Sequence, residues 1–223
     1  MGVPALIVAA GSGQRLGAGG PKALVSLNGR PLYAWSVDAF RQAAHIDRIY
    51  VAVPPGEGDR FTEPGIVTVD GGETRSHSVA NGLAAISAEG DPGIVVVHDA
   101  ARPLVSPALI DAAVIGLDSD TELHALIAAA PMTDTVKRLG ADGVVRETLD
   151  RTELVSVQTP QVFRSESLRN ALESGDLASA TDDASLVELA GGAVGVIESP
   201  SGNIKVTVPA DLELAAILLE RKE

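Results

Sequence analysis

The sequence predicts a three-layer α/β protein in which helices cover both faces of a mostly parallel sheet. Short runs rich in Val and Ile alternate along the chain with alanine-rich stretches of helical period, and Gly, Pro or Asp separates them. Most of the strand-like runs are apolar on both faces, which is typical of parallel strands buried between two helical layers. The chain of 223 residues, of which 45% are hydrophobic, is long enough to fill one sizeable core. We therefore expect one domain over residues 1–223.

Each element follows from its own segment of this alternation. The apolar runs predict strands at 5–9, 48–54, 65–69, 93–98, 124–131, 155–163, 193–199 and 203–208. The helical periods predict helices at 31–43, 74–88, 106–117, 165–174, 182–190 and 209–221. Ser106-Pro107, Ser165 and Thr181-Asp182 are start signals typical of helix N-termini, and they support three of these helices.

One segment departs from the alternation. Residues 133–154 contain two polar, alternating strand-like runs about the turn "GADG", with too few apolar residues to fill a core. This pattern predicts a protruding β-hairpin arm. The arm could be a solvated hairpin or could pack on a second copy of the protein. We favour the second interpretation, a homodimer formed through the arm, because an isolated hairpin is only marginally stable in water.

Composition limits the partners and the location of the protein. The net charge is −13 and the sequence pI is about 4.7, so the surface would repel a nucleic acid backbone. The absence of cysteine excludes disulfides and thiolate metal sites. The first apolar run is too short to span a bilayer and has no basic region before it, so we expect a cytoplasmic protein with no membrane partner.

The glycine-rich stretch "AAGSGQRLGAGGPKAL" (9–24) follows the first predicted strand and is typical of a phosphate-binding loop. It does not match the dinucleotide fingerprint, because Gly17 lies one residue too far along the chain for that spacing. It does not match the Walker A pattern either, because no hydroxyl residue follows Lys22. The remaining feature is a pair of cations, Arg15 and Lys22, at opposite ends of the loop. Such a pair suits a triphosphate, although glycine-rich turns with stray basic residues are also common.

Other basic residues also lie in polar segments at the predicted strand ends. The relevant segments are "DGGETRSHSV" (70–79), "HDAARP" (98–103), "DRTE" (150–153), "QTPQVF" (158–163), "TDDAS" (181–185) and "NIKVT" (203–207). Six of the 17 basic residues lie in or beside these segments and the first loop: Arg15, Lys22, Arg75, Arg102, Arg151 and Lys205. In a protein this acidic, the placement favours a site for a multiply charged anion.

Together these motifs resemble one known family. In this order and spacing, over nearly the whole chain, they are similar to those of the 2-C-methyl-D-erythritol 4-phosphate cytidylyltransferases of the non-mevalonate isoprenoid pathway. The resemblance implies a Rossmann-like nucleotidyltransferase sheet with the hairpin arm. Three residues depart from the usual family pattern: Leu16 stands where Met is usual, Ala23 where Gln is frequent and Glu73 where Asp is common. These changes affect packing or a base contact, and every charged position expected to carry chemistry is present.

The resemblance also implies a role for individual residues. It implies that Arg15, Lys22, Arg151 and Lys205 carry the catalysis, with Mg²⁺ bridging the oxygens of the triphosphate. It implies that CTP is bound by Ala9, Ala10, Gly11, Arg15, Lys22, Gly72, Glu73, Ser78, Asp99 and Ala100. The polyol phosphate would meet Asp99, Arg102, Thr159, Thr181 and Lys205, and also Thr135 and Arg151 from the partner's arm. Simpler roles also exist for some of these side chains, such as a helix cap for Thr181 or a strand-end cap for Asp99.

The expected chemistry agrees with the residues that the chain lacks. A phosphate monoester has a second pKa near 6, so at neutral pH it is already a dianionic nucleophile and needs no strong general base. The loop offers no carboxylate cage, so we expect Mg²⁺ to arrive with CTP rather than on protein ligands. Two alternatives remain open at this point. One is a ribitol 5-phosphate cytidylyltransferase, which shares these motifs, and the other is a non-catalytic module that binds CTP.

Overall fold

A seven-stranded sheet forms the centre of the computed structural model, which describes residues 2–17, 19–178 and 180–221. The strand order is β11-β7-β10-β6-β1-β4-β5. Their bounds are β1 (Val3–Val8), β4 (Ile46–Val53), β5 (Ile66–Asp70), β6 (Ile94–Asp99), β7 (Ala125–Pro131), β10 (Val155–Arg164) and β11 (Val194–Glu198). β10 runs antiparallel to both of its neighbours, and the other pairs are parallel. The prediction of a mostly parallel sheet is confirmed.

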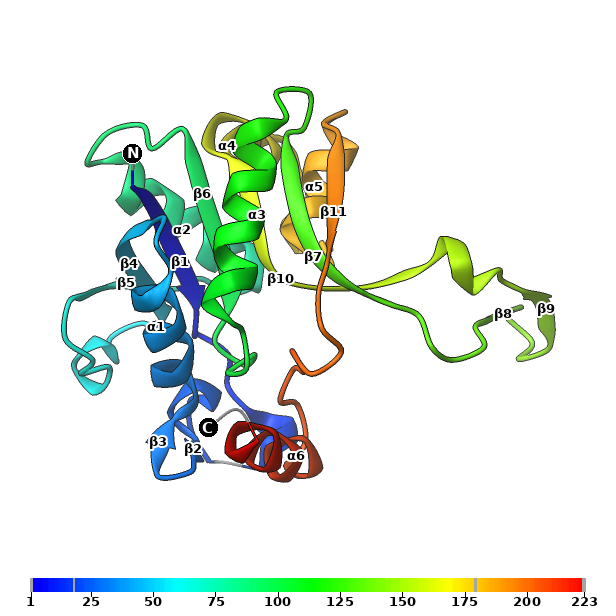
Figure 1. Cartoon of the computed structure of the whole chain (residues 1–223), viewed down its shortest axis with the longest axis horizontal. Helices are drawn as coiled ribbons and strands as arrows, with labels where there is room; N and C mark the ends of the chain where they lie inside the picture. The colour runs from blue at the N-terminus through cyan, green and yellow to red at the C-terminus, as the bar shows by residue number, and fades with distance from the viewer. Residues whose placement is uncertain (1, 18, 179, 222–223) are drawn as a thin grey trace.

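Helices cover both faces of this sheet, as predicted. Helices α1 (Leu32–Gln42) and α3 (Pro107–Ser119) pack on one face, and α2 (Arg75–Ser87), α4 (Ser165–Ser174) and α5 (Asp183–Leu189) pack on the other (Figure 1). β1 shows why its apolar run is continuous. Ala5 and Ile7 face the first helical layer while Leu6 faces the second, and all three are fully buried. The predicted helices and these seven strands agree with the structure to within two residues at each end.

A third, smaller apolar cluster lies beside the glycine-rich loop. It is formed by the last helix, α6 (Pro209–Glu220), with a short hairpin of β2 (Ser26–Leu27) and β3 (Arg30–Pro31) and neighbouring loops. Its buried residues are Leu16, Leu27, Leu32, Leu104, Val206 and Ala215. Leu16 comes from the loop that carries Arg15, and Val206 follows Lys205. The cluster therefore supports two segments that carry basic residues.

The prediction of a strand at 203–208 was wrong. This segment crosses the end of the sheet as irregular backbone. Val206 donates its backbone N–H to the carbonyl of Ala101 at 2.8 Å, and Arg102 Nη1 donates to the carbonyl of Asn203 at 2.8 Å. The alternation of Ile204 and Val206 arises because both side chains pack into the small cluster. A strand would show the same alternation, so the sequence pattern could not distinguish a strand from irregular backbone here.

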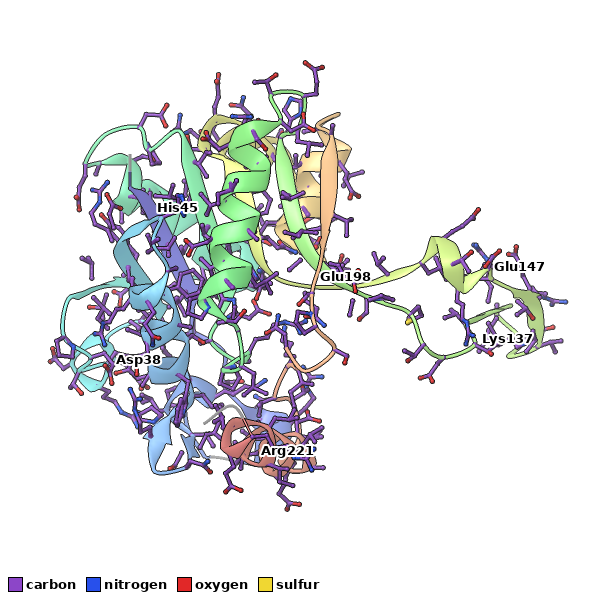
Figure 2. All side chains as sticks on the ribbon, viewed as in Figure 1. Asp38, His45, Lys137, Glu147, Glu198 and Arg221 are labelled. Carbon is purple, nitrogen blue, oxygen red and sulfur yellow. The ribbon has the colours of Figure 1, made fainter. Side chains whose placement is uncertain are left out.

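The arm at 133–154 extends away from the rest of the molecule as an antiparallel hairpin (Figure 1). Its strands are β8 (Lys137–Leu139) and β9 (Val145–Thr148), and the turn between them is closed by a bond from Gly140 N–H to the Val144 carbonyl at 2.9 Å. Lys137 and Glu147 lie at its far end (Figure 2). Leu139, Val144 and Val145 are each more than half exposed, at 59%, 53% and 52%. The predicted hairpin is confirmed, and it leaves apolar side chains uncovered.

Candidate functional site

The loops after β1, β5 and β6 meet at the carboxyl ends of the strands and enclose a cavity of about 490 Å³. Ala100 donates its backbone N–H to the carbonyl of Val8 at 3.1 Å, which joins the loop after β6 to the end of β1. Lys22 donates its backbone N–H to the carbonyl of Gly11 at 3.0 Å and so closes the glycine-rich loop on itself. Ligands of open α/β sheets bind at this edge, where the loops can vary without disturbing the core.

Two short 3₁₀ turns orient the cations of the glycine-rich loop. Gly13 and Gly17 bracket the first turn, Gln14–Leu16, with φ of +68° and +67°, a left-handed conformation that favours glycine. Leu16 points into the small cluster, so its neighbour Arg15 is left exposed at the cavity. The second turn, Lys22–Leu24, buries Ala23 and leaves Lys22 half-buried in the cavity wall.

The turn before α2 forms the opposite wall. A Cβ added at Gly71 would lie only 2.7 Å from Ala10 Cβ and 2.9 Å from Ser78 Oγ, so only glycine allows this close approach of the two loops. Ser78 Oγ accepts the backbone N–H of Gly72 at 3.0 Å and donates to the carbonyl of Thr74 at 3.0 Å. Ser78 therefore fixes the shape of the turn from beneath, because both of its hydrogen-bonding roles are used within it.

Asp99 lies between two cations at the end of β6. Arg75 donates Nε–H to Asp99 Oδ1 at 2.9 Å, and Lys205 donates from Nζ to Asp99 Oδ2 at 2.6 Å. Burial alone would raise the pKa of Asp99, but Arg75 and Lys205 hold this pKa well below its ordinary value. Asp99 is therefore ionised with both oxygens engaged, and it is not available as a general base in this arrangement.

The remaining two cations of the cavity have no such partner. Among the residues that the structure describes, neither Arg15 nor Lys22 has a carboxylate oxygen within 4.0 Å. Burial lowers the pKa of Lys22 to about 8, and the nearby charges of Lys205 and Arg15 add to the effect. Two unpaired cations in the lining of one cavity create a site that favours a multiply charged anion.

A buried hydrogen-bond chain lies beneath the cavity. Asp99 donates its backbone N–H to Thr159 Oγ1 at 3.1 Å, and Thr159 Oγ1 lies 2.9 Å from His98 Nδ1. His98 Nε2 lies 3.2 Å from the carbonyl of Arg102, so Nε2 carries the proton and Thr159 donates to Nδ1. Burial lowers the pKa of His98 to about 4, which keeps the ring neutral. The chain fixes the backbone that carries Asp99.

Most of the residues assigned to the site from the sequence line this one cavity: Ala9, Ala10, Gly11, Arg15, Lys22, Gly72, Glu73, Ser78, Asp99, Ala100 and Lys205. Arg102 and Thr159 are buried beneath it, where Arg102 donates to the carbonyls of Asn203 at 2.8 Å and Val157 at 3.3 Å. Thr181 is exposed before α5, and Asp182 rather than Thr181 caps that helix by accepting from Ser185 N–H at 2.9 Å.

Thr135 and Arg151 lie in the arm, outside this cavity. Arg151 donates from Nη1 to the carbonyl of Thr133 at 2.6 Å. It lines a separate hollow of about 460 Å³ at the base of the arm, together with Leu154, Val155 and Val196. The two cavities share no lining residue. Within one chain, therefore, the arm does not bring Arg151 to Lys22 or Lys205.

Sequence reasoning gave no role to two charged residues of the site. Arg75 was noted among the basic residues at the strand ends, and the structure places it between Asp99 and Asp183. Asp183, in the first turn of α5, is fully buried. In the sequence, Asp183 follows the cap residue Asp182 in "TDDAS", which is a pattern typical of a carboxylate at the start of a helix. Only its pairing with Arg75, 108 positions away, reveals that it is connected to the wall of the site, which Arg75 lines.

In the described ranges no three or more His, Cys, Asp or Glu side chains gather in a way that could hold a metal ion. No helix of the described chain has the length and apolar character needed to cross a membrane.

Comparison with known proteins identifies the family. A family model described as 2-C-methyl-D-erythritol 4-phosphate cytidylyltransferase matches residues 3–221. The chain belongs to this family. The chain is 41% identical to the cytidylyltransferase of that name from Parasynechococcus marenigrum (strain WH8102), over 98% of each chain. It is 44% identical to the one from Rhodococcus jostii (strain RHA1), over 98% of this chain and 95% of the relative. This protein is therefore a cytidylyltransferase, an enzyme of the nucleotidyltransferase class.

Solved structures support the same assignment. The 4-diphosphocytidyl-2C-methyl-D-erythritol synthase from Anaerococcus prevotii DSM 20548 superposes with a TM-score of 0.84 at 28% identity, covering 99% of this chain and 96% of that one. The 2-C-methyl-D-erythritol 4-phosphate cytidylyltransferase from Thermus thermophilus gives a TM-score of 0.76 at 35% identity, covering 99% and 100%. The fold of this cytidylyltransferase, including the sheet and its helical layers, is thus the fold of the family.

Proposed function

We propose that the cavity binds CTP and 2-C-methyl-D-erythritol 4-phosphate and forms CDP-methylerythritol and pyrophosphate. A phosphate oxygen of the acceptor forms a bond to the α-phosphorus of CTP. The bond from this phosphorus to the oxygen that bridges to the β-phosphorus breaks, and pyrophosphate leaves with the electron pair. The observation that carries the proposal is the distribution of charge: Arg15 and Lys22 have no carboxylate partner among the described residues, whereas Lys205 is already held by Asp99.

Arg15 and Lys22 bind the triphosphate in this proposal. They lie on the loop whose two ends are joined by the bond from Lys22 N–H to Gly11, so the loop can surround the phosphates from two sides. Their charge neutralises the negative charge that grows on the departing pyrophosphate. The walls formed by Ala9, Ala10, Gly11, Gly72, Glu73, Ser78 and Ala100 hold the nucleoside.

The acceptor lies on the side of Asp99 and Lys205. The Lys205 side chain is 43% exposed, so it can turn from Asp99 toward an incoming phosphate. Asp99 then remains ionised beside Arg75 and accepts hydrogen bonds from the polyol. Thr159 and Arg102 support this side from beneath. The proposal assigns Thr181, which is exposed before α5, to the same side. Alignment of the two anions supplies most of the catalysis, because a phosphate dianion needs no general base.

Mg²⁺ accompanies CTP in this proposal. The donor set of the cavity fits such a role, because Asp99 stays paired with Arg75 and the described residues offer no carboxylate cage. When bound, the metal stabilises charge on the phosphate oxygens as a Lewis acid. Arg15 and Lys22 would add their positive charge at the same phosphates.

The arm makes the protein a homodimer in this proposal. Its exposed apolar residues Leu139, Val144 and Val145 need a partner surface, and Val155, Val157 and Val196 are exposed beside the hollow at its base. An arm exchanged between two copies covers both surfaces and carries Thr135 and Arg151 to the acceptor side of the partner's cavity. Residues 133–154 then form a dimerisation arm on a single cytidylyltransferase domain that acts in the cytoplasm.

The proposed reaction is tested by measuring pyrophosphate released from CTP with methylerythritol 4-phosphate or with ribitol 5-phosphate as the acceptor. We expect kcat/KM to favour methylerythritol phosphate strongly, turnover to stop on exhaustive chelation, and ATP or GTP to replace CTP poorly. Preference for ribitol phosphate would favour the related cytidylyltransferase instead. Binding of CTP without release of pyrophosphate by any acceptor would favour the non-catalytic module.

A further inference from the structure

Four charged side chains of alternating sign contact one another in a row, and three of them, Arg75, Asp99 and Lys205, line the cavity. Asp183 contacts Arg75, Arg75 contacts Asp99, and Asp99 contacts Lys205. They come from the first turn of α5, the first turn of α2, the end of β6 and the irregular segment before α6. Four elements that are distant in the sequence are therefore joined at one edge of the cavity by charge-assisted hydrogen bonds.

Arg75 is the only one of these four side chains that touches two carboxylates. Its Nε donates to Asp99, and its Nη1 donates to Asp183. The planar guanidinium can satisfy both acids at once, whereas a lysine ammonium is a point charge on a flexible stem. Arg75 is part of the cavity lining, and its side chain is only 24% exposed.

The contact between Asp183 and Arg75 stabilises a buried negative charge. It is fully buried, so its charge depends on Arg75 for compensation. Burial raises the pKa of Asp183, and the charge of Arg75 opposes that rise. A buried carboxylate at the start of α5 therefore anchors Arg75, and Arg75 in turn fixes the orientation of Asp99.

From this arrangement we infer that Arg75, anchored by Asp183, is a positioning residue for the acceptor half of the site. This inference rests on the proposed function. Arg75 fixes one oxygen of Asp99. The other oxygen binds Lys205 in the ligand-free site and is left for the polyol when Lys205 turns to the acceptor phosphate. Through Asp183 it also fixes the start of α5, two residues after Thr181. The loop that carries Arg15 and Lys22 has no hydrogen bond to Arg75 among the described residues, so the triphosphate half is held independently.

The test compares the two substrates in the Arg75→Lys variant, which keeps the charge and loses the bidentate geometry. We expect KM for methylerythritol phosphate to rise about tenfold or more, because small displacements of positioning groups have large effects on alignment. The Kd for CTP, measured by calorimetry without an acceptor, should change less than about threefold. A purely structural defect would lower the active fraction and kcat and would leave the acceptor KM unchanged.

Matched variants complete the experiment. Arg60→Lys makes the same change at an exposed arginine that pairs with Glu57 at 2.6 Å, and both constants should stay at the wild-type values. Asp183→Asn removes only the charge of the anchor and should raise the acceptor KM about threefold or more without affecting the Kd for CTP. This variant decides the question alone if Arg75→Lys does not fold.

Two results would overturn the inference: an unchanged acceptor KM in the folded variants, or a loss of CTP affinity as large as the loss for the acceptor. Failure of the proposed function has a different signature, since the wild-type protein itself would then release no pyrophosphate with methylerythritol phosphate, and the inference would fall with it.

Discussion

The lowered pKa of Lys22 predicts a pH dependence of CTP binding. Burial, with help from Lys205 and Arg15, lowers this pKa from 10.5 to about 8. Lys22 of the free enzyme is therefore charged below about pH 8 and loses its charge as the pH rises through that value. The charged fraction falls from about nine-tenths at pH 7 to about one-tenth at pH 9. If the charged form binds the triphosphate, the affinity for CTP should fall about tenfold over this range.

The assay is calorimetric titration of the enzyme with CTP between about pH 7 and pH 9. Phosphate groups are already ionised above pH 7, so their own titration contributes little. Bound triphosphate raises the pKa of Lys22, so kcat at saturating CTP should stay nearly constant while kcat/KM falls. Lys22→Arg keeps its charge at every pH tested and should remove the pH step.

The matched control for Lys22→Arg is a lysine outside the cavity. Lys137→Arg makes the same change on the exposed arm, where Lys137 donates to Thr148 Oγ1 at 2.6 Å, and it should keep the step. A Kd for CTP that is the same at pH 7 and pH 9 in the wild-type enzyme would refute the reasoning. So would a Lys22→Arg variant that retains the full step.

Three further predictions concern the support beneath the site. His98 is buried and its pKa is lowered to about 4, so below about pH 6.5 the unfolded state binds a proton that the folded state does not bind. The free energy of unfolding should therefore fall by about 3 kcal/mol as the pH falls from about 6.5 to about 4. Urea unfolding of His98→Asn should show a smaller dependence of this free energy on pH over the same range. Arg102→Lys should lower the free energy of unfolding by about 1–3 kcal/mol, because one ammonium cannot replace both hydrogen bonds to the carbonyls of Asn203 and Val157. An unchanged urea midpoint would contradict this. Leu16→Ala should raise the Kd for CTP several-fold by loosening the loop that carries Arg15, and an unchanged Kd would show that the small cluster does not support the loop.

The sequence predicted the sheet and its layers because continuous burial leaves a clear pattern. Residues such as Ala5, Leu6 and Ile7 of β1 are apolar in succession because both of their faces are covered. The pattern of Ile204 and Val206 was equally clear and yet misleading, since it reflects packing under α6 rather than pairing with a strand. Periodicity reports which side chains are buried and does not report what the backbone bonds to.

The sequence also predicted part of the candidate site, namely the residues that lie close together along the chain. The glycines, Arg15 and Lys22 could be singled out because they lie together in one short stretch of the sequence after a strand, and the structure places Gly11, Arg15 and Lys22 in the lining of one cavity. The pairing of Arg75 with Asp99 and Asp183 has no local signature, because it spans 24 and 108 positions and depends on how three elements meet. The roles assigned to the site residues all stay predictions, and those of Thr135, Arg151 and Thr181 need in addition a bound acceptor or a second chain.

The most direct test of the shared active site mixes two inactive homodimers. Lys22→Ala and Arg151→Ala should each be nearly inactive alone, because every site then lacks one member. If the arm is exchanged, a mixed dimer carries both lesions in one site and leaves the other site intact. Random mixing by refolding or co-expression makes about half of the dimers mixed, so about a quarter of the wild-type activity should return. If activity stays at the level of the separate variants although mixed dimers are present, Arg151 serves its own chain and the shared-site account is wrong.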